Sequence, residues 1–145
     1  MRASATATIA GRSLETAVVV QCRTSEPETR DLLALADRDR LIDAVVGWAD
    51  RASPGLGDVL DDLLAGPGGP YLRSLGHVVQ GESDPAWLQR PDVDRGLQTV
   101  ARCGLGYDVL IRSHEFRQAV RLAERHPELR LVLDRAGKPR SPAVT

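Results

Sequence analysis

Five short apolar runs alternate with segments of helical period along this chain of 145 residues. The runs span residues 17–22, 42–49, 72–80, 107–112 and 129–134. Val18-Val19-Val20 and Leu131-Val132-Leu133 are apolar at successive positions, which is typical of strands buried on both faces. Strands and helices that alternate this regularly predict an α/β fold with a parallel sheet.

The segments between the predicted strands carry helix signals. Ser25 and Glu28 have the spacing of a capping box, and Pro91 opens a helical pattern that ends before Gly104. The predicted helices cover residues 27–37, 55–65, 91–103 and 113–126. The chain has the usual length of one domain. We therefore expect a single domain over residues 1–145, with residues 1–12 and 140–145 frayed.

The amino-acid composition narrows the classes of partner that this chain can bind. The 19 Lys and Arg residues nearly balance the 20 Asp and Glu residues and are scattered, so we expect no nucleic acid partner. No apolar run approaches the roughly 18 residues that span a bilayer, and residues 1–12 lack the apolar core of a signal peptide. We expect no membrane association and a cytoplasmic location. Cys22 and Cys103 lack the spacing of a metal or disulfide motif.

Polar residues lie at the carboxyl ends of the predicted strands, where parallel α/β folds gather their reactive groups. They are Gln21, Cys22, Asp50, His77, Gln80, Arg112, Asp134 and Arg135. Such a rim could bind a polyhydroxylated acid or lactone, because arginine holds carboxylates in a bidentate fork. An alternative stays open for Gln21, Gln80 and Asp50, since strand-end polar groups often serve only the loop backbone.

His77 is the only histidine inside a predicted strand, which makes it the leading candidate for an acid, a base or a ligand. A structural role for His77 also stays open. His114 and His126 flank a predicted helix, and we expect both at the surface. Trp48 and Trp87 are interpreted as packing anchors.

Several segments, in this order and spacing, resemble the amidohydrolase-related family that contains sugar-lactone hydrolases. The likeness covers about residues 16–139 and rests on Val18-Val19-Val20-Gln21, Val45-Val46-Gly47-Trp48-Ala49-Asp50, Gly76-His77-Val78-Val79-Gln80, and Leu131-Val132-Leu133-Asp134 with Gly137-Lys138-Pro139.

The resemblance implies a (β/α)8 TIM barrel, here a partial barrel of about five βα units, in which a divalent metal often activates water. This sequence has no His-x-His pair, and Arg135 stands where the family has a ligand histidine. An arginine expected before His77 is replaced by Gly76. We therefore expect no metal cofactor.

The resulting hypothesis is a truncated hydrolase of the sugar-lactone or cyclic-ester type with weak or lost activity. Its catalytic residue is His77, and Gln21, Gln80, Arg112 and Arg135 bind a sugar lactone or organic acid. The alternative is a non-catalytic binding or assembly module derived from the same fold. Five strands of an eight-stranded barrel leave open edges, so we also expect a homo-oligomer or a complementing chain, unless the units settle into an open doubly wound sheet.

Overall fold

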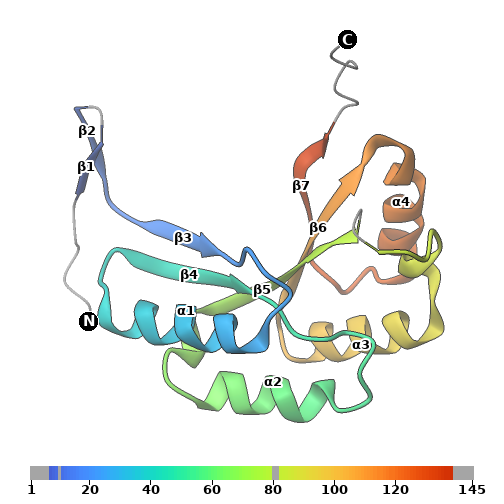
Figure 1. The fold of residues 1–145 in the computed structure, drawn as a ribbon, viewed down its shortest axis with the longest axis horizontal. Helices are drawn as coiled ribbons and strands as arrows, with labels where there is room; N and C mark the ends of the chain where they lie inside the picture. Colours follow the sequence, from blue (N-terminus) through green and yellow to red (C-terminus); the bar gives the residue numbers. More distant parts are fainter. Residues whose placement is uncertain (1–6, 10, 80–81, 139–145) are drawn as a thin grey trace.

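A curled sheet of five parallel strands organises the molecule (Figure 1). The computed structural model describes the main chain of residues 7–9, 11–79 and 82–138, and the side chains of residues 11–79 and 82–134. The strands follow one another across the sheet in chain order: β3 (Ala17–Val20), β4 (Ile42–Gly47), β5 (Leu72–Val78), β6 (Gly106–Arg112) and β7 (Leu131–Lys138). The predicted fold class, an α/β partial barrel, is confirmed.

Four α-helices cover the convex side of the sheet, as Figure 1 shows. They are α1 (Glu26–Arg38), α2 (Leu56–Ala65), α3 (Pro91–Arg102) and α4 (Phe116–Arg125), joined by the short 3-10 helices η1 (Gly69–Tyr71), η3 (Trp87–Gln89) and η4 (Ser113–Glu115). Ser25 caps α1, because its hydroxyl accepts the Glu28 N–H at 3.2 Å. Leucine and valine side chains between helices and sheet form the core, among them Leu33, Val45, Leu60, Leu75 and Leu97.

A close contact between Gly47 and Thr29 fixes the position of the carboxyl end of β4. A Cβ atom on Gly47 would lie 2.5 Å from Cγ2 of Thr29 on α1, so only glycine fits there. The Thr29 hydroxyl in turn accepts the Trp48 N–H at 2.7 Å and donates to the Trp48 carbonyl at 2.8 Å. These bonds connect the end of β4 to α1 and fix the position of the Trp48 main chain.

The amino-terminal region contains a hairpin that the sequence did not predict, in which Ala7–Ile9 (β1) and Arg12–Leu14 (β2) pair antiparallel, with Gly11 in the turn at a φ of 75°. Residues 1–6 and 10 lie outside the described residues, and the frayed end expected at residues 1–12 stays a prediction. Strands of three residues carry too little alternation for the sequence to reveal them. Several predicted strand boundaries also move. The first barrel strand ends at Val20, which leaves Gln21 and Cys22 in the following loop, β4 ends at Gly47, β5 ends at Val78, and the last strand spans Leu131–Lys138. Residues 140–145 lie outside the described chain.

None of the helices in the described residues combines the length and apolar character that a bilayer crossing would require. The cytoplasmic location stays a prediction.

Candidate functional site

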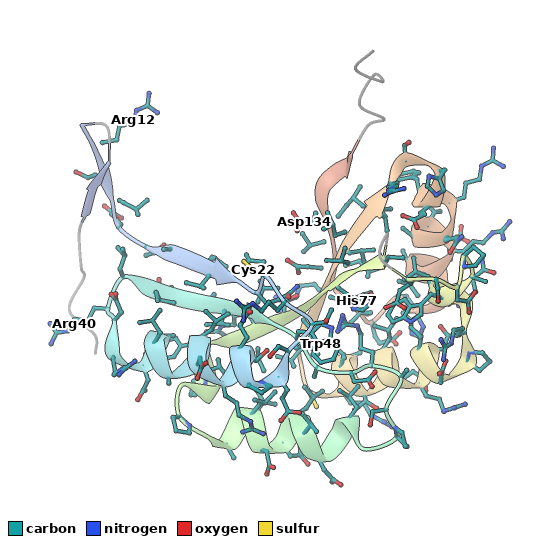
Figure 2. The ribbon with its side chains drawn as sticks, in the orientation of Figure 1. Arg12, Cys22, Arg40, Trp48, His77 and Asp134 are labelled. Atoms are coloured by element: carbon teal, nitrogen blue, oxygen red, sulfur yellow. The ribbon has the colours of Figure 1, made fainter. Side chains whose placement is uncertain are left out.

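A hollow of about 320 Å³ opens at the carboxyl end of the sheet. It is lined by Val20, Gln21, Cys22, Gly76, His77, Val78, Asp108, Leu110 and Asp134. These residues come from β5, β6, β7 and the end of β3, so the hollow spans the sheet from one edge to the other. Figure 2 shows Cys22 beside the end of β3 and Asp134 on β7, the two outer strands of the curled sheet. This is the position where parallel α/β proteins bind their ligands.

Asp108, one of two acidic residues that line this hollow, is held by a neighbouring strand. The Ser74 hydroxyl on β5 donates to Oδ1 of Asp108 at 2.5 Å. Burial raises the pKa of Asp108, the Ser74 hydrogen bond lowers it, and the nearby charge of Asp134 raises it, with a net shift upward. The sequence interpretation missed Asp108 because it sits inside a strand, although its alternation with Tyr107 and Val109 was the available signal.

Gln21 places an amide at the same hollow. Its main-chain N–H donates to the Val46 carbonyl at 2.8 Å, which extends the ladder by one bond beyond β3. Its Nε2 lies 3.2 Å from where a Cβ atom on Gly76 would be, so the missing side chain of Gly76 makes room for the amide. Among the described residues, the buried Oε1 of Gln21 finds no hydrogen-bond partner. That oxygen is available to a ligand hydroxyl or to water.

His77 borders the hollow, but its ring is held in a buried cluster. The ring is 6% exposed and stacks on Trp87 with 4.3 Å between the centroids. Its Nδ1 lies 3.1 Å from Nε1 of Trp48, and its Nε2 lies 2.5 Å from Oε1 of Glu82. Burial lowers the pKa of His77 to about 3, and the charge of Arg51 acts in the same direction. The catalytic role of His77 stays a prediction.

Arg51 is a buried residue that holds the strand ends next to the hollow in place. It is 1% exposed, and its guanidinium donates to the carbonyls of Gly76 at 2.6 Å and Ala49 at 3.1 Å. The guanidinium also lies over the Tyr107 ring, 4.7 Å from the centroid. Arg51 therefore joins the ends of β4 and β5. This role has no signal in the sequence, since arginine at a strand end is usually solvated.

The remaining predicted site residues lie in several places. Arg112 is exposed at the end of β6, where its main-chain N–H donates to Glu115 at 2.7 Å, and it does not line the hollow. Gln80 lies outside the described residues. Arg135 belongs to β7 by its main chain, but its side chain also lies outside them. Asp50 is exposed and accepts the Ala52 N–H at 3.0 Å, which is an ordinary turn contact.

The expectation that His126 lies at the surface is wrong. Its ring is 3% exposed, and Nε2 lies 2.9 Å from Oδ1 of Asp94 on α3. The same carboxylate accepts a hydrogen bond from Arg125 at 3.1 Å. Asp94 thus draws the end of α4 onto α3, a tertiary contact that helix periodicity does not reveal.

The residues at the hollow do not form a complete metal site. In the part of the chain that the structure describes, no group of three or more His, Cys, Asp and Glu side chains is placed to hold an ion. Asp108 and Asp134 contribute two carboxylates, whereas catalytic metal sites usually have at least three protein ligands. The described residues at the hollow therefore do not fit a catalytic metal ion, and the expectation of no metal cofactor stays a prediction.

Comparison with known proteins agrees with this architecture. An L-fucono-1,5-lactonase of Burkholderia ambifaria is 30% identical over 131 residues, which cover 90% of this chain and 44% of that protein. An L-fucono-1,5-lactonase of Burkholderia multivorans is 35% identical over 129 residues, covering 88% and 42%. The chain thus spans less than half the length of these relatives.

Solved structures give the same result. An amidohydrolase from Burkholderia multivorans, crystallised with bound zinc, superposes with a TM-score of 0.77 at 33% identity, over 85% of this chain and 42% of that one. A second crystal form of it, with bound HEPES, gives a TM-score of 0.76. The amidohydrolase family profile matches residues 1–144. The chain therefore belongs to the amidohydrolase family.

Proposed function

We propose that this chain takes part in hydrolysing a sugar lactone or a similar cyclic ester, which binds in the hollow at the carboxyl end of the sheet. The observation that carries this proposal is the convergence of Gln21, Asp108 and Asp134 on that hollow. Carboxylates can move protons, and an amide can hold a hydroxyl or a carbonyl. The names of the two lactonase relatives support the substrate class.

In the proposed reaction, the carboxylate of Asp108 takes a proton from a water molecule. The water oxygen attacks the lactone carbonyl carbon, and a tetrahedral intermediate forms. The ring C–O bond then breaks, and the leaving ring oxygen takes the proton back from Asp108, which yields a hydroxy acid. The raised pKa of Asp108 suits this task, because a base works best when its pKa lies closer to the working pH.

His77 was the base expected from the sequence. We instead propose that it holds the Trp48 and Glu82 side chains in position beside the hollow. With a pKa of about 3, its imidazole is a weak base at neutral pH. Both of its ring nitrogens are already engaged, by Trp48 and by Glu82. Gln21 remains a proposed substrate contact, and Gln80, Arg112 and Arg135 also stay proposed substrate contacts.

We also propose that turnover by these residues alone is slow. General-base catalysis by one group contributes about a hundredfold to ten-thousandfold, far less than a complete enzyme site supplies. A second candidate function is a non-catalytic binding or assembly module. The exposed valines of the concave face, Val18, Val20 and Val132, favour this alternative, since such surfaces associate.

The deciding experiment measures the opening of aldonolactones, L-fucono-1,5-lactone among them, above the spontaneous rate. We expect activity that Asp108→Asn reduces about a hundredfold or to background. Asp61→Asn on the exposed side of α2 is the matched control and should retain full activity. His77→Gln should lower the rate without changing the shape of the pH–rate profile. No hydrolysis above background, or full activity in Asp108→Asn, would overturn the proposal.

A further inference from the structure

Two carboxylates lie on the same face of neighbouring strands at the hollow, Asp108 on β6 and Asp134 on β7. In the register of these strands, Asp108 is opposite Val132 and Leu110 is opposite Asp134. Asp134 is therefore displaced from Asp108 by about 7 Å along the strands and about 5 Å across them. Burial is the largest cause of the raised pKa of Asp108, and the charge of Asp134 adds to it. The two carboxylates thus interact through their charges.

The other described residues that line the hollow bring no positive charge at neutral pH. Gln21 contributes a neutral amide. His77 is a neutral imidazole, because burial lowers its pKa to about 3 and the charge of Arg51 acts in the same direction. Arg51 itself is buried and donates to the main-chain carbonyls of Ala49 and Gly76. The lining described here therefore presents a negative charge to a ligand.

A negative lining distinguishes between two classes of lactone. An uncharged sugar lactone offers hydroxyl groups, which donate hydrogen bonds to the carboxylates of Asp108 and Asp134. A lactone that also bears a free carboxylate brings a further negative charge into a space of about 320 Å³. Like charges this close repel each other, and we expect each of the two carboxylates to weaken the binding of such a lactone by about tenfold.

We infer that the hollow binds uncharged polyhydroxylated lactones, and that Asp134 is the specificity residue that excludes lactones bearing a free carboxylate. The inference rests on the proposed function, because it concerns the ligand of the same hollow, and it narrows the class of substrate. Asp108 takes and returns the proton in the proposed reaction. Asp134 takes no part in that step, so its charge acts on which ligand binds.

The same charge favours release of the product. When the ring C–O bond breaks, the hydroxy acid that forms loses its carboxyl proton to water at neutral pH. The ligand thereby changes from neutral to negative, while Asp108 is again a carboxylate. Repulsion by Asp134 then makes the hydroxy acid bind more weakly than the lactone from which it came. The product is therefore a poor inhibitor of the next turnover.

Two lactones that differ at one carbon test this selection. D-glucono-1,4-lactone carries a hydroxymethyl group where D-glucaro-1,4-lactone carries a carboxylate. The ratio of their kcat/KM values should favour the uncharged lactone in the unmodified chain and fall about tenfold in Asp134→Asn. Any change in the basicity of Asp108 affects both lactones and cancels in this ratio. Asp61→Asn, which removes a negative charge from the exposed side of α2, is the matched control and should keep the ratio.

Binding of D-gluconate, followed by NMR titration, gives a readout that needs no turnover. Its Kd should be about tenfold lower in Asp134→Asn than in the unmodified chain and unchanged in Asp61→Asn. An unchanged kcat/KM ratio in Asp134→Asn, or gluconate that binds it no more tightly, overturns the inference and leaves the proposed function standing. The same holds if the chain opens L-fucono-1,5-lactone but not D-glucono-1,4-lactone. If it opens no lactone above the spontaneous rate, both fall.

Discussion

The indole N–H of Trp48 donates to Nδ1 of His77 across 3.1 Å, and this bond fixes the tautomer of the histidine. With Nδ1 accepting, Nε2 carries the proton and points it at Oε1 of Glu82, 2.5 Å away. The ring also stacks on Trp87 of η3. One neutral imidazole thus connects the end of β4, strand β5 and the segment that leads to α3.

Replacing His77 with Asn should destabilise the protein by about 1 to 3 kcal/mol, because the half-buried indole N–H of Trp48 and the Glu82 carboxylate lose their partner. Urea unfolding followed by tryptophan fluorescence and by circular dichroism measures this change. His114→Asn is the matched control, since His114 is exposed on η4, and it should shift the free energy of unfolding by less than about 0.5 kcal/mol. Equal effects of the two substitutions would show that the His77 cluster adds no stability.

The stability of the folded chain should fall as the pH drops below about 6.5. The pKa of His77 is about 3 in the folded protein against 6.5 in the unfolded chain, so between these values the unfolded chain binds a proton that the folded one does not. Burial and Arg51 disfavour the charged ring, whereas Asp50 favours it and Glu82 lies against Nε2. One such group changes the free energy of unfolding by at most about 1.4 kcal/mol per pH unit.

Urea unfolding of the unmodified chain and of His77→Gln, at several pH values from 7 down to 5, measures that slope. The variant has nothing to titrate at this position, so its free energy of unfolding should depend less on pH. Parallel curves for the two proteins would mean that His77 binds its proton equally well in both states.

Gly96→Ala should destabilise the fold even though alanine is the better helix former by about 1 kcal/mol. A Cβ atom at this position of α3 would lie 1.9 Å from the main-chain oxygen of Arg51, and backbone cannot move aside as a flexible side chain can. Gly57→Ala in α2 is the control, because its Cβ atom would meet nothing closer than Thr99 Cγ2 at 3.8 Å. Thermal melts should show a lower Tm for Gly96→Ala and an equal or higher Tm for Gly57→Ala.

The sequence revealed most of the sheet because runs of branched apolar residues mark strands locally. The runs at Val18-Val19-Val20 and Leu131-Val132-Leu133 are strands β3 and β7, as expected, but the expectation that both faces are buried is wrong, since Val18, Val20 and Val132 are exposed. The β1–β2 hairpin was missed because its strands are too short to show a period. Ser25 was recognised as a cap from its spacing to Glu28 alone, and the structure confirms that bond.

The hollow was harder to foresee because tertiary contacts decide which polar groups reach it. Asp108 faces the hollow only because β6 sits between β5 and β7 in this register. Arg51 follows a predicted strand in the sequence, where a cation is usually solvated, yet the carbonyl of Gly76 and the ring of Tyr107, both distant along the chain, make its burial possible. Arg112 follows its strand as expected but remains exposed beside the start of η4.

The pKa of Asp108 should respond in opposite directions to two neighbouring substitutions. Ser74→Ala removes the hydroxyl that donates to Oδ1 of Asp108 and stabilises the carboxylate, so the pKa of Asp108 should rise. Asp134→Asn removes the nearby negative charge that opposes ionisation, so the same pKa should fall.

Carboxyl carbon NMR titration of Asp108, assigned through the loss of its signal in Asp108→Asn, measures both shifts directly. If Asp108 is the general base for lactone opening, the acid limb of the pH–rate profile must move with its pKa, upward in Ser74→Ala and downward in Asp134→Asn. Shifts in the NMR titration without matching shifts in the rate profile would assign the proton transfer to another group. Shifts of the same sign in both variants would show that Ser74 and Asp134 do not act on Asp108 through the contacts described above.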